Sequence, residues 1–204
     1  MFSGKTSALI CGVEADSAAS QGRVLLKHAI DDRDGAHEVI RSRTGLTLEK
    51  ARRVASLDDV TVHPHTLYAV DEAQFFDESL LRLLHRIAAR ESARLLIAGL
   101  DRDFQGNPFG FVRQLAIEAL QLPIPAEIHQ LHSRCSRAVP DPQTGKWSRC
   151  CDPAAFSQRL YNGTPSSESR ILVGGESLYQ PACAKHHSIH PESASRWHEG
   201  LTER

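Results

Sequence analysis

Three short apolar runs and one amphipathic stretch dominate the pattern of hydrophobic and polar positions along the chain. The runs cover residues 23–27, 66–70 and 95–100, and their continuous apolar character is typical of buried strands. The last run has no polar alternation, so we expect it to be buried on both faces, as in parallel sheets. Between the second and third runs, the leucines of residues 77–90 recur at helical spacing behind an acidic start. The order strand, helix, strand predicts a right-handed βαβ unit.

Weaker patterns complete an α/β domain. Residues 7–22 and 111–120 have helical character, whereas residues 31–45 are charged, interrupted by glycines and expected to form a loop. The second apolar run ends directly in Asp71 and Glu72. We therefore expect these two acids at the carboxyl end of a strand, where open α/β sheets build their binding sites.

The chain changes character after Pro123 and Pro125. Short extended runs separated by turns with proline and glycine predict a small antiparallel unit around the cysteines, and the polar residues from 188 onward are expected to fray. The extended runs are residues 127–131, 154–160 and 171–173. The expected domains are residues 1–125, residues 126–190 and a tail over residues 191–204.

The composition narrows the classes of function. Hydrophobic residues make up 41% and charged residues 24% of the chain, with a formal net charge of -1. This balance gives no general attraction to nucleic acids or membranes, so partners of neither kind are expected. No apolar run approaches the roughly 18 residues of a membrane-spanning helix, and the first residues lack the pattern of a secretory signal. We therefore expect a cytoplasmic protein.

Four of the five cysteines, Cys135, Cys150, Cys151 and Cys183, lie in the last third of the chain. In a reducing compartment this clustering favours metal ligation, with buried unligated thiols as the alternative. Structural zinc needs four tetrahedral cysteine or histidine ligands, commonly in two close pairs. Cys183 and His186 form one such C-x-x-H pair.

Ser3, Gly4, Lys5 and Thr6 match the second half of a Walker A loop. In such loops, backbone amides hold phosphates, the lysine reaches the β- and γ-phosphates and the hydroxyl binds Mg²⁺. A match of four residues also occurs in ordinary exposed turns. The full motif needs a glycine and a strand before Met1, so we expect the true start of the protein upstream; a truncated, inactive product is the alternative.

The pair Asp71 and Glu72 follows the Walker A match by about 65 residues. This position suits a Walker B arrangement, in which the aspartate supports Mg²⁺ and the neighbouring glutamate accepts a proton. The alternative is that the pair caps the helix starting near Asp77.

Several motifs, in the same order along the chain, resemble those of the zinc-containing thymidine kinases. They are DEAQFF at residues 71–76, GLDRDFQ at 99–105, PFG at 108–110, AAFSQR at 154–159 and GGESLY at 174–179. Residues 1–6 resemble the end of that family's phosphate loop, and residues 31–33 resemble its Asp-x-Arg element. The resemblance covers residues 1–187. It implies an α/β fold with a P-loop NTPase-type parallel sheet and a small zinc-stabilised lasso domain that closes over the nucleoside.

The resemblance implies an ATP:thymidine 5′-phosphotransferase of nucleotide salvage, which acts on thymidine or deoxyuridine with ATP and Mg²⁺. Glu72 resembles the catalytic base that takes the proton of the 5′-hydroxyl. The residues implied in binding ATP and Mg²⁺ are Met1, Phe2, Ser3, Gly4, Lys5, Thr6, Asp31, Asp32, Arg33, Asp71, Ala73 and Gln74. The resemblance also implies a homotetramer.

The same resemblance implies a nucleoside site built largely from the second domain. Its residues are Phe104, Phe109, Phe156, Ser157, Arg159, Arg170, Ile171, Leu172, Val173, Gly174 and Tyr179. Ser157 stands where the family usually has a threonine near the thymine methyl group, so methyl selectivity is open to change. For Phe104, Phe109 and Tyr179, plain core packing is the alternative.

The zinc ligands depart from the family pattern in one respect. Where a C-x-x-C pair is expected, Cys135 and Cys150 are separated by an insertion at residues 136–149. A loop of this length can still close on a metal, because each doubling of loop length costs only about 0.6 kcal/mol. The predicted ligands are Cys135, Cys150, Cys183 and His186, with Cys151, His132 and His187 as alternatives.

Two other classes of function compete with the kinase. One is a different P-loop NTPase, such as a motor or helicase-like ATPase, and the other is a zinc-stabilised binding module without catalysis. Chain length argues against the motor, because nothing after Phe109 resembles a second motor lobe or an arginine-finger segment.

Overall fold

The computed structural model describes residues 2–16, 21–31, 38–161, 164–165 and 178–188. The chain forms two compact units. The sheet unit comprises residues 4–101 and 108–130. The cysteine unit comprises residues 1–3, 102–107 and 131–204.

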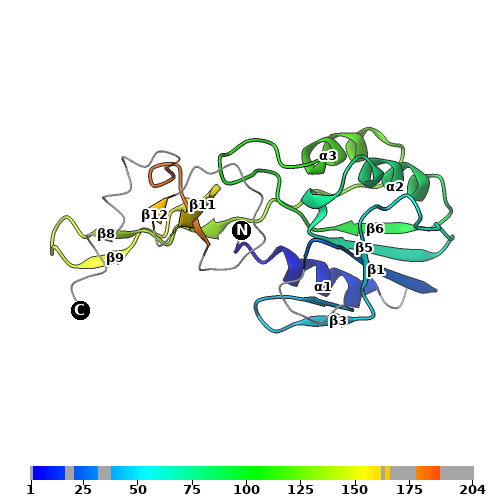
Figure 1. Ribbon diagram of the computed structural model, residues 1–204, viewed down its shortest axis with the longest axis horizontal. Coiled ribbons are helices and arrows are strands. Elements are labelled where there is room, and N and C mark those ends of the chain that lie inside the picture. Colours follow the sequence, from blue (N-terminus) through cyan, green and yellow to red (C-terminus); the bar gives the residue numbers. More distant parts are fainter. Residues whose placement is uncertain (1, 17–20, 32–37, 162–163, 166–177, 189–204) are drawn as a thin grey trace. The chain divides into compact units, whose positions relative to one another are not determined.

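A four-stranded parallel sheet forms the centre of the sheet unit (Figure 1). Its strands, in spatial order, are β4 (Arg52–Val54), β1 (Gly22–His28), β5 (Thr66–Asp71) and β6 (Arg94–Ile97). All three neighbouring pairs are parallel. The prediction of an α/β fold on a parallel sheet is therefore confirmed.

Helices cover both faces of this sheet, with α1 (Lys5–Asp16) on one face and α2 (Ser79–Ala88) and α3 (Val112–Gln121) on the other (Figure 1). β5 is buried along its whole length because it contributes to both layers. Leu67 and Ala69 belong to the apolar cluster under α1, whereas Tyr68 and Val70 belong to the cluster under α2 and α3. This two-sided burial explains the continuous apolar run that predicted the strand.

The helix predicted over residues 77–90 is α2. Its buried leucines and Ile87 pack on the sheet, as the amphipathic pattern indicates. Asp77 precedes it, and its Oδ1 accepts a hydrogen bond from the Ser79 amide at 2.9 Å. Because this bond satisfies one of the free amides of the first turn, it helps to set where the helix starts.

Two predictions about secondary structure in the sheet unit were wrong in detail. The helix predicted over residues 7–22 ends at Asp16, and β1 already begins at Gly22. The loop predicted over residues 31–45 contains the strand β2 (Val39–Arg41), which pairs with β3 (Thr47–Glu49). The cause is Ile40, which is 1% exposed and completes the apolar cluster under α1 in spite of its charged surroundings.

The third apolar run differs from its prediction in burial. β6 is shorter than the run, and its leucines and Ile97 are only half-buried. The sheet order places β6 at an edge, where one side has no neighbouring strand. β6 packs on both faces, as expected, with Leu95 and Ile97 on the cluster under α2 and α3 and Leu96 on the cluster under α1, but its burial is only partial.

The cysteine unit consists of small antiparallel pairs, as predicted. β7 (Ser133–Arg134) pairs with β10 (Pro153–Ala154), and β8 (Ala138–Pro140) pairs with β9 (Trp147–Arg149) as a hairpin. β11 (Phe156–Tyr161) lies between β12 (Thr164–Pro165) and β13 (Tyr179–Ala182). Residues 127–131 contain no strand, so that prediction was wrong. The run at 171–173 and the tail from 189 onward lie outside the described residues.

Of the helices within the described ranges, none is both long and apolar enough to cross a membrane.

Candidate functional site

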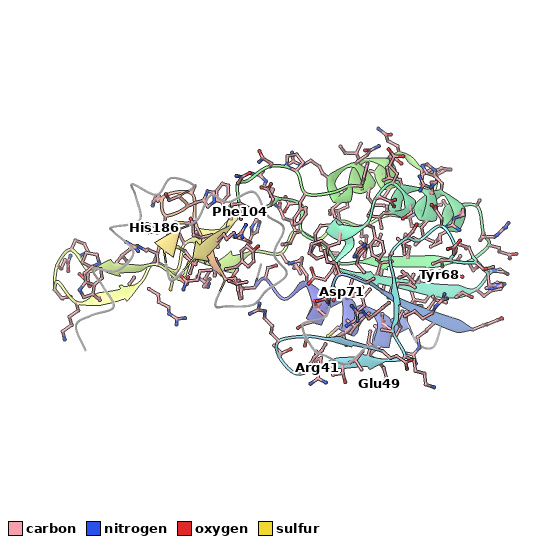
Figure 2. All side chains as sticks on the ribbon, in the orientation of Figure 1. Arg41, Glu49, Tyr68, Asp71, Phe104 and His186 are labelled. Atoms are coloured by element: carbon pink, nitrogen blue, oxygen red, sulfur yellow. The ribbon has the colours of Figure 1, made fainter. Side chains whose placement is uncertain are left out.

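The carboxyl end of β5 meets the first turn of α1. Figure 2 labels Asp71, which ends β5 beside α1. The Thr6 hydroxyl donates to the Asp71 carboxylate, with Oγ1 at 3.3 Å from Oδ1 and 3.2 Å from Oδ2. Adjacent oxygen ligands of an octahedral Mg²⁺ ion lie about 3 Å apart, so this pair of oxygen donors fits Mg²⁺. The two residues are 65 positions apart in the sequence, and the fold brings them together.

The start of α1 has the features of a phosphate-binding helix terminus. The helix begins at Lys5, directly after Gly4, and the Gly4 carbonyl accepts from the Ala8 amide at 2.9 Å. The amides of the first turn have no partners within the helix, and they carry partial positive charge. Anions are therefore favoured at this end of α1.

Glu72 follows Asp71 in an unusual backbone conformation. Its φ and ψ are 53° and 43°, in the left-handed region that costs a non-glycine residue roughly 1–2 kcal/mol. Its carboxylate accepts a hydrogen bond from the Gln74 side-chain amide, in the short 3-10 helix η1 (Ala73–Phe75). The side-chain Oε1 of Gln74 in turn accepts from the Leu100 backbone amide at 2.9 Å. Gln74 is 3% exposed, so Glu72 is held by a buried side chain fixed at both ends.

The neighbourhood of Gln74 leaves no room for added atoms. A Cβ on Gly110 would lie 2.3 Å from the Gln74 carbonyl oxygen, and a Cβ on Gly99 would lie 3.1 Å from the Ala73 Cβ. Phe75 and Phe109 pack edge to face, with their ring centroids 5.6 Å apart. The motifs at residues 99–105 and 108–110 thus each contribute a glycine that packs closely against residues 73–74.

Lys27 belongs to this edge of the sheet, although sequence reasoning assigned it no role. It is 3% exposed and lies in register with Asp71 on the neighbouring strand. A lysine at the end of an apolar run was the signal that could have identified it.

The other residues predicted to bind ATP and Mg²⁺ fall in several places. Asp31 is buried just after β1, and Ala73 is fully buried in η1. Phe2 and Ser3 belong to the cysteine unit. Met1, Asp32 and Arg33 lie outside the described residues.

The four predicted metal ligands converge in the cysteine unit. The Sγ atoms of Cys135, Cys150 and Cys183 and a ring nitrogen of His186 all lie within 4.8 Å of one another. His186 Nδ1 is 3.5 Å from Cys135 Sγ and 3.3 Å from Cys183 Sγ, and the Sγ atoms of Cys150 and Cys183 are 4.0 Å apart. Tetrahedral zinc with bonds of about 2.0–2.3 Å separates its ligand atoms by about 3.3–3.8 Å. The observed spacing therefore fits zinc.

The titration behaviour of this group also suits a cation. Burial, together with the nearby Cys135 and Cys183 thiols, raises the pKa of the Cys150 thiol to about 11. Burial, together with the nearby Arg137 charge, lowers the pKa of His186. The imidazole is thus available as a neutral ligand, whereas buried thiolates require a metal charge to offset their repulsion.

The alternative ligands are not part of this group. Cys151 follows Cys150 but is exposed, has a positive φ of 58° and does not belong to the cluster. His132 is exposed, and His187 makes other contacts. The choice of Cys150 over Cys151 agrees with the geometry.

Residues predicted to bind the nucleoside share one face of the β11 and β13 pair. Arg159 lies directly opposite Tyr179, and Ser157 is two positions earlier on the same face of β11. All three are buried, and the Arg159 guanidinium lies 5.2 Å from the ring centroid of Phe104. Phe156 is on the opposite face of β11. Phe109 belongs to the sheet unit, and residues 170–174 lie outside the described residues.

The sequence also matches a known family. A family model described as "TK: Thymidine kinase" matches residues 1–187. The match covers almost all of the 204-residue chain and includes the residues at the end of β5, the cysteine cluster and the residues of β11 and β13.

Proposed function

The chain belongs to the thymidine kinase family, and from this premise we propose that it transfers the γ-phosphoryl group of ATP to the 5′-hydroxyl of thymidine or deoxyuridine. The observation that supports this most directly is the arrangement at the end of β5. There the Thr6 hydroxyl meets the Asp71 carboxylate, and the next residue, Glu72, is held by Gln74. Phosphoryl transfer to a hydroxyl uses oxygen ligands that hold Mg²⁺ and an oriented carboxylate that accepts the proton, and this arrangement offers both.

On the phosphate side, the protein's task is positioning and charge neutralisation. The first amides of α1 hold the phosphate oxygens, and the Lys5 ammonium contacts the β- and γ-phosphates. Thr6 and Asp71 would hold Mg²⁺, which would supply positive charge to offset the negative charge of the phosphates. The buried Lys27 adds a basic side chain near Asp71.

On the acceptor side, Glu72 takes the proton of the 5′-hydroxyl. In a loose transition state the hydroxyl loses its proton late, so a carboxylate is a sufficiently strong base. Gln74 acts as a positioning residue, because its side-chain amide holds a carboxylate oxygen of Glu72 while its own Oε1 is held by the Leu100 amide.

The nucleoside is bound by the cysteine unit, with Phe104 at the nucleoside pocket and Tyr179 closing over the base. Ser157 lies near the 5-position of the pyrimidine. Because serine lacks the methyl group of threonine, it leaves more room there. We propose that zinc in the cysteine cluster stabilises this unit and that the active protein is a homotetramer.

The test is a coupled ATP-phosphorylation assay with thymidine, deoxyuridine and deoxycytidine. The Glu72→Gln variant keeps the shape of the side chain and removes its basicity, so the rate should fall by about 100-fold or more. Glu78→Gln is the matched control, because Glu78 is an exposed acid just before α2. Its rate should match that of the unaltered protein.

Two results would count against the proposal. If the protein phosphorylates none of the three nucleosides while still binding ATP, the kinase activity is wrong for this chain. If it is active but Glu72→Gln retains the rate, the base is another residue.

A further inference from the structure

His187 follows the zinc ligand His186 but makes a different set of contacts. Its ring stacks on Phe156, with centroids 4.3 Å apart and planes inclined by 6°. Its Nε2 lies 2.6 Å from the backbone carbonyl oxygen of Phe104, 83 positions earlier in the chain. A carbonyl oxygen can only accept, so this ring nitrogen carries the hydrogen.

The residues before and after His187 are both held in place. His186 lies in the cysteine cluster, 3.3 Å from Cys183 Sγ. The Ser188 amide donates to Gln158 Oε1 at 2.7 Å, and Gln158 is 0% exposed in the middle of β11. His187 is thus held between a metal ligand and a buried strand residue.

The partner of His187 is a compact loop of the same unit, residues 102–107. Asp103 organises it, since its Oδ1 accepts from the amides of Gln105 and Asn107, each at 2.9 Å. Gly106 packs on Phe156, where an added Cβ would lie 3.2 Å from the ring. The loop therefore has its own internal structure and needs only a few attachments to hold it in place.

The hydrogen bond from His187 is a directional contact of this loop. The Arg159 guanidinium over the Phe104 ring and the packing of Gly106 on Phe156 allow sliding. A hydrogen bond of 2.6 Å to the backbone of Phe104 fixes both distance and direction.

We propose that His187 is a positioning residue that transmits the rigidity of the cysteine cluster to residues 102–107 and so sets the position of Phe104. The inference rests on the proposed function in one respect, namely that Phe104 borders the nucleoside. The proposal predicts different effects on nucleoside binding and on ATP binding. Loss of the His187 hydrogen bond, or of the metal, weakens nucleoside binding through the same loop and leaves ATP binding unaffected.

The experiment compares His187→Phe with His187→Gln and with the control His132→Phe. Phenylalanine keeps the ring that stacks on Phe156 and removes the donor, glutamine keeps a donor and removes the ring, and His132 is exposed in the same unit. Because a typical hydrogen bond contributes modestly, the KM for thymidine should rise by about 3- to 10-fold in His187→Phe. The KM for ATP, kcat and the zinc content should stay unchanged. His187→Gln should recover part of the loss, and His132→Phe should have no effect.

Hydrogen exchange gives a reading that does not depend on activity. Amides of residues 102–107 should exchange faster in His187→Phe, and also in the unaltered protein after zinc is chelated. Chelating zinc from His187→Phe should then add little in this loop, because both changes remove the same attachment.

Three results would overturn the inference. The first is unchanged exchange at residues 102–107 in His187→Phe. The second is a rise in KM for ATP equal to the rise for thymidine, accompanied by loss of zinc, which would mean a general loss of structure. The third is His187→Gln behaving no better than His187→Phe. If the unaltered protein phosphorylates no nucleoside, the proposed function fails, and the exchange data alone still decide the role of His187.

Discussion

The two units of the molecule are held together by different means. In the sheet unit, two apolar clusters flank the parallel strands, and Leu26, Leu67 and Leu83 are 0% exposed. In the cysteine unit, the most buried side chains include Gln158 at 0%, Arg159 at 2% and Cys135 at 1% exposure. Both apolar clusters of the described residues lie in the sheet unit.

This difference means that the two units are stabilised by different kinds of interaction. Apolar burial contributes about 25 cal/mol per Å² without demanding exact partners, so the sheet unit is stabilised wherever its pattern is kept. Buried polar and charged groups are costly unless each is satisfied, so the cysteine unit depends on particular contacts. We infer that a metal supplies the order that its small core cannot.

Removing the metal should have the largest effect and should separate the two units. Cys183→Ser takes one ligand from the cluster, and chelation removes the metal itself. In both cases we expect the cysteine unit to lose most of its protection against hydrogen exchange, with nucleoside phosphorylation reduced to background. ATP affinity, measured by calorimetry, should stay within a few-fold of its starting value.

Cys151→Ser is the matched control, because Cys151 is exposed and outside the cluster. It should change neither zinc content nor activity. Equal loss of exchange protection in both units after chelation would contradict the separation.

The next effect concerns a close backbone approach in the sheet unit. Gly110 has a φ of 55°, and a Cβ there would lie 2.3 Å from the Gln74 carbonyl oxygen. Backbone strain and overlap together should make Gly110→Ala less stable by about 3 kcal/mol or more in urea denaturation. Gly145, with a φ of 67° and nothing within 4 Å of its Cβ, is the control. Gly145→Ala carries only the conformational cost of about 1–2 kcal/mol.

Similar losses for the two alanine variants would show that the space around Gln74 adjusts more easily than its contacts indicate.

The smallest expected effect is on kcat, and it comes from Gln74 in the sheet unit. Gln74→Leu keeps much of the buried volume and removes the amide that holds Glu72. We expect kcat to fall about 10-fold, since a base that is free to rotate is less often in position. The KM for thymidine should change little, in contrast to His187→Phe. Steady-state kinetics with both substrates measures the difference, and a rise in KM with unchanged kcat would argue against a positioning role for Gln74.

Much of the sheet unit could be predicted because its pattern is set locally. The runs that became β1 and β5 and the periodicity of α2 carry their burial in their own sequence. β2 was missed because its two apolar residues stand among charges, and only its contact with the cluster under α1 makes it a strand. Burial of β6 was overestimated because sequence does not reveal which strand lies at an edge.

The candidate site divides in the same way. Ligand chemistry and spacing predicted the four members of the cysteine cluster, and motifs predicted that Thr6 and Asp71 act together. The contact between His187 and Phe104 could not be predicted, because 83 positions separate them and no motif links the two residues. The buried hydrogen bonds of Gln74 likewise depend on how η1 meets residue 100.

The hairpin of β8 and β9 closes the insertion between Cys135 and Cys150 on itself. At its base the Cys150 amide donates to the Arg137 carbonyl at 2.8 Å, and the Cys151 amide donates to the Cys135 carbonyl at 3.4 Å. These bonds join the two ends of the insertion, so that Cys135 and Cys150 meet as if only a few residues lay between them. A hairpin of another length that also closes on itself could therefore replace residues 136–149 without moving the two cysteines. A search for paired cysteines at fixed intervals would miss such a group, whereas a search that skips self-closed hairpins would find it.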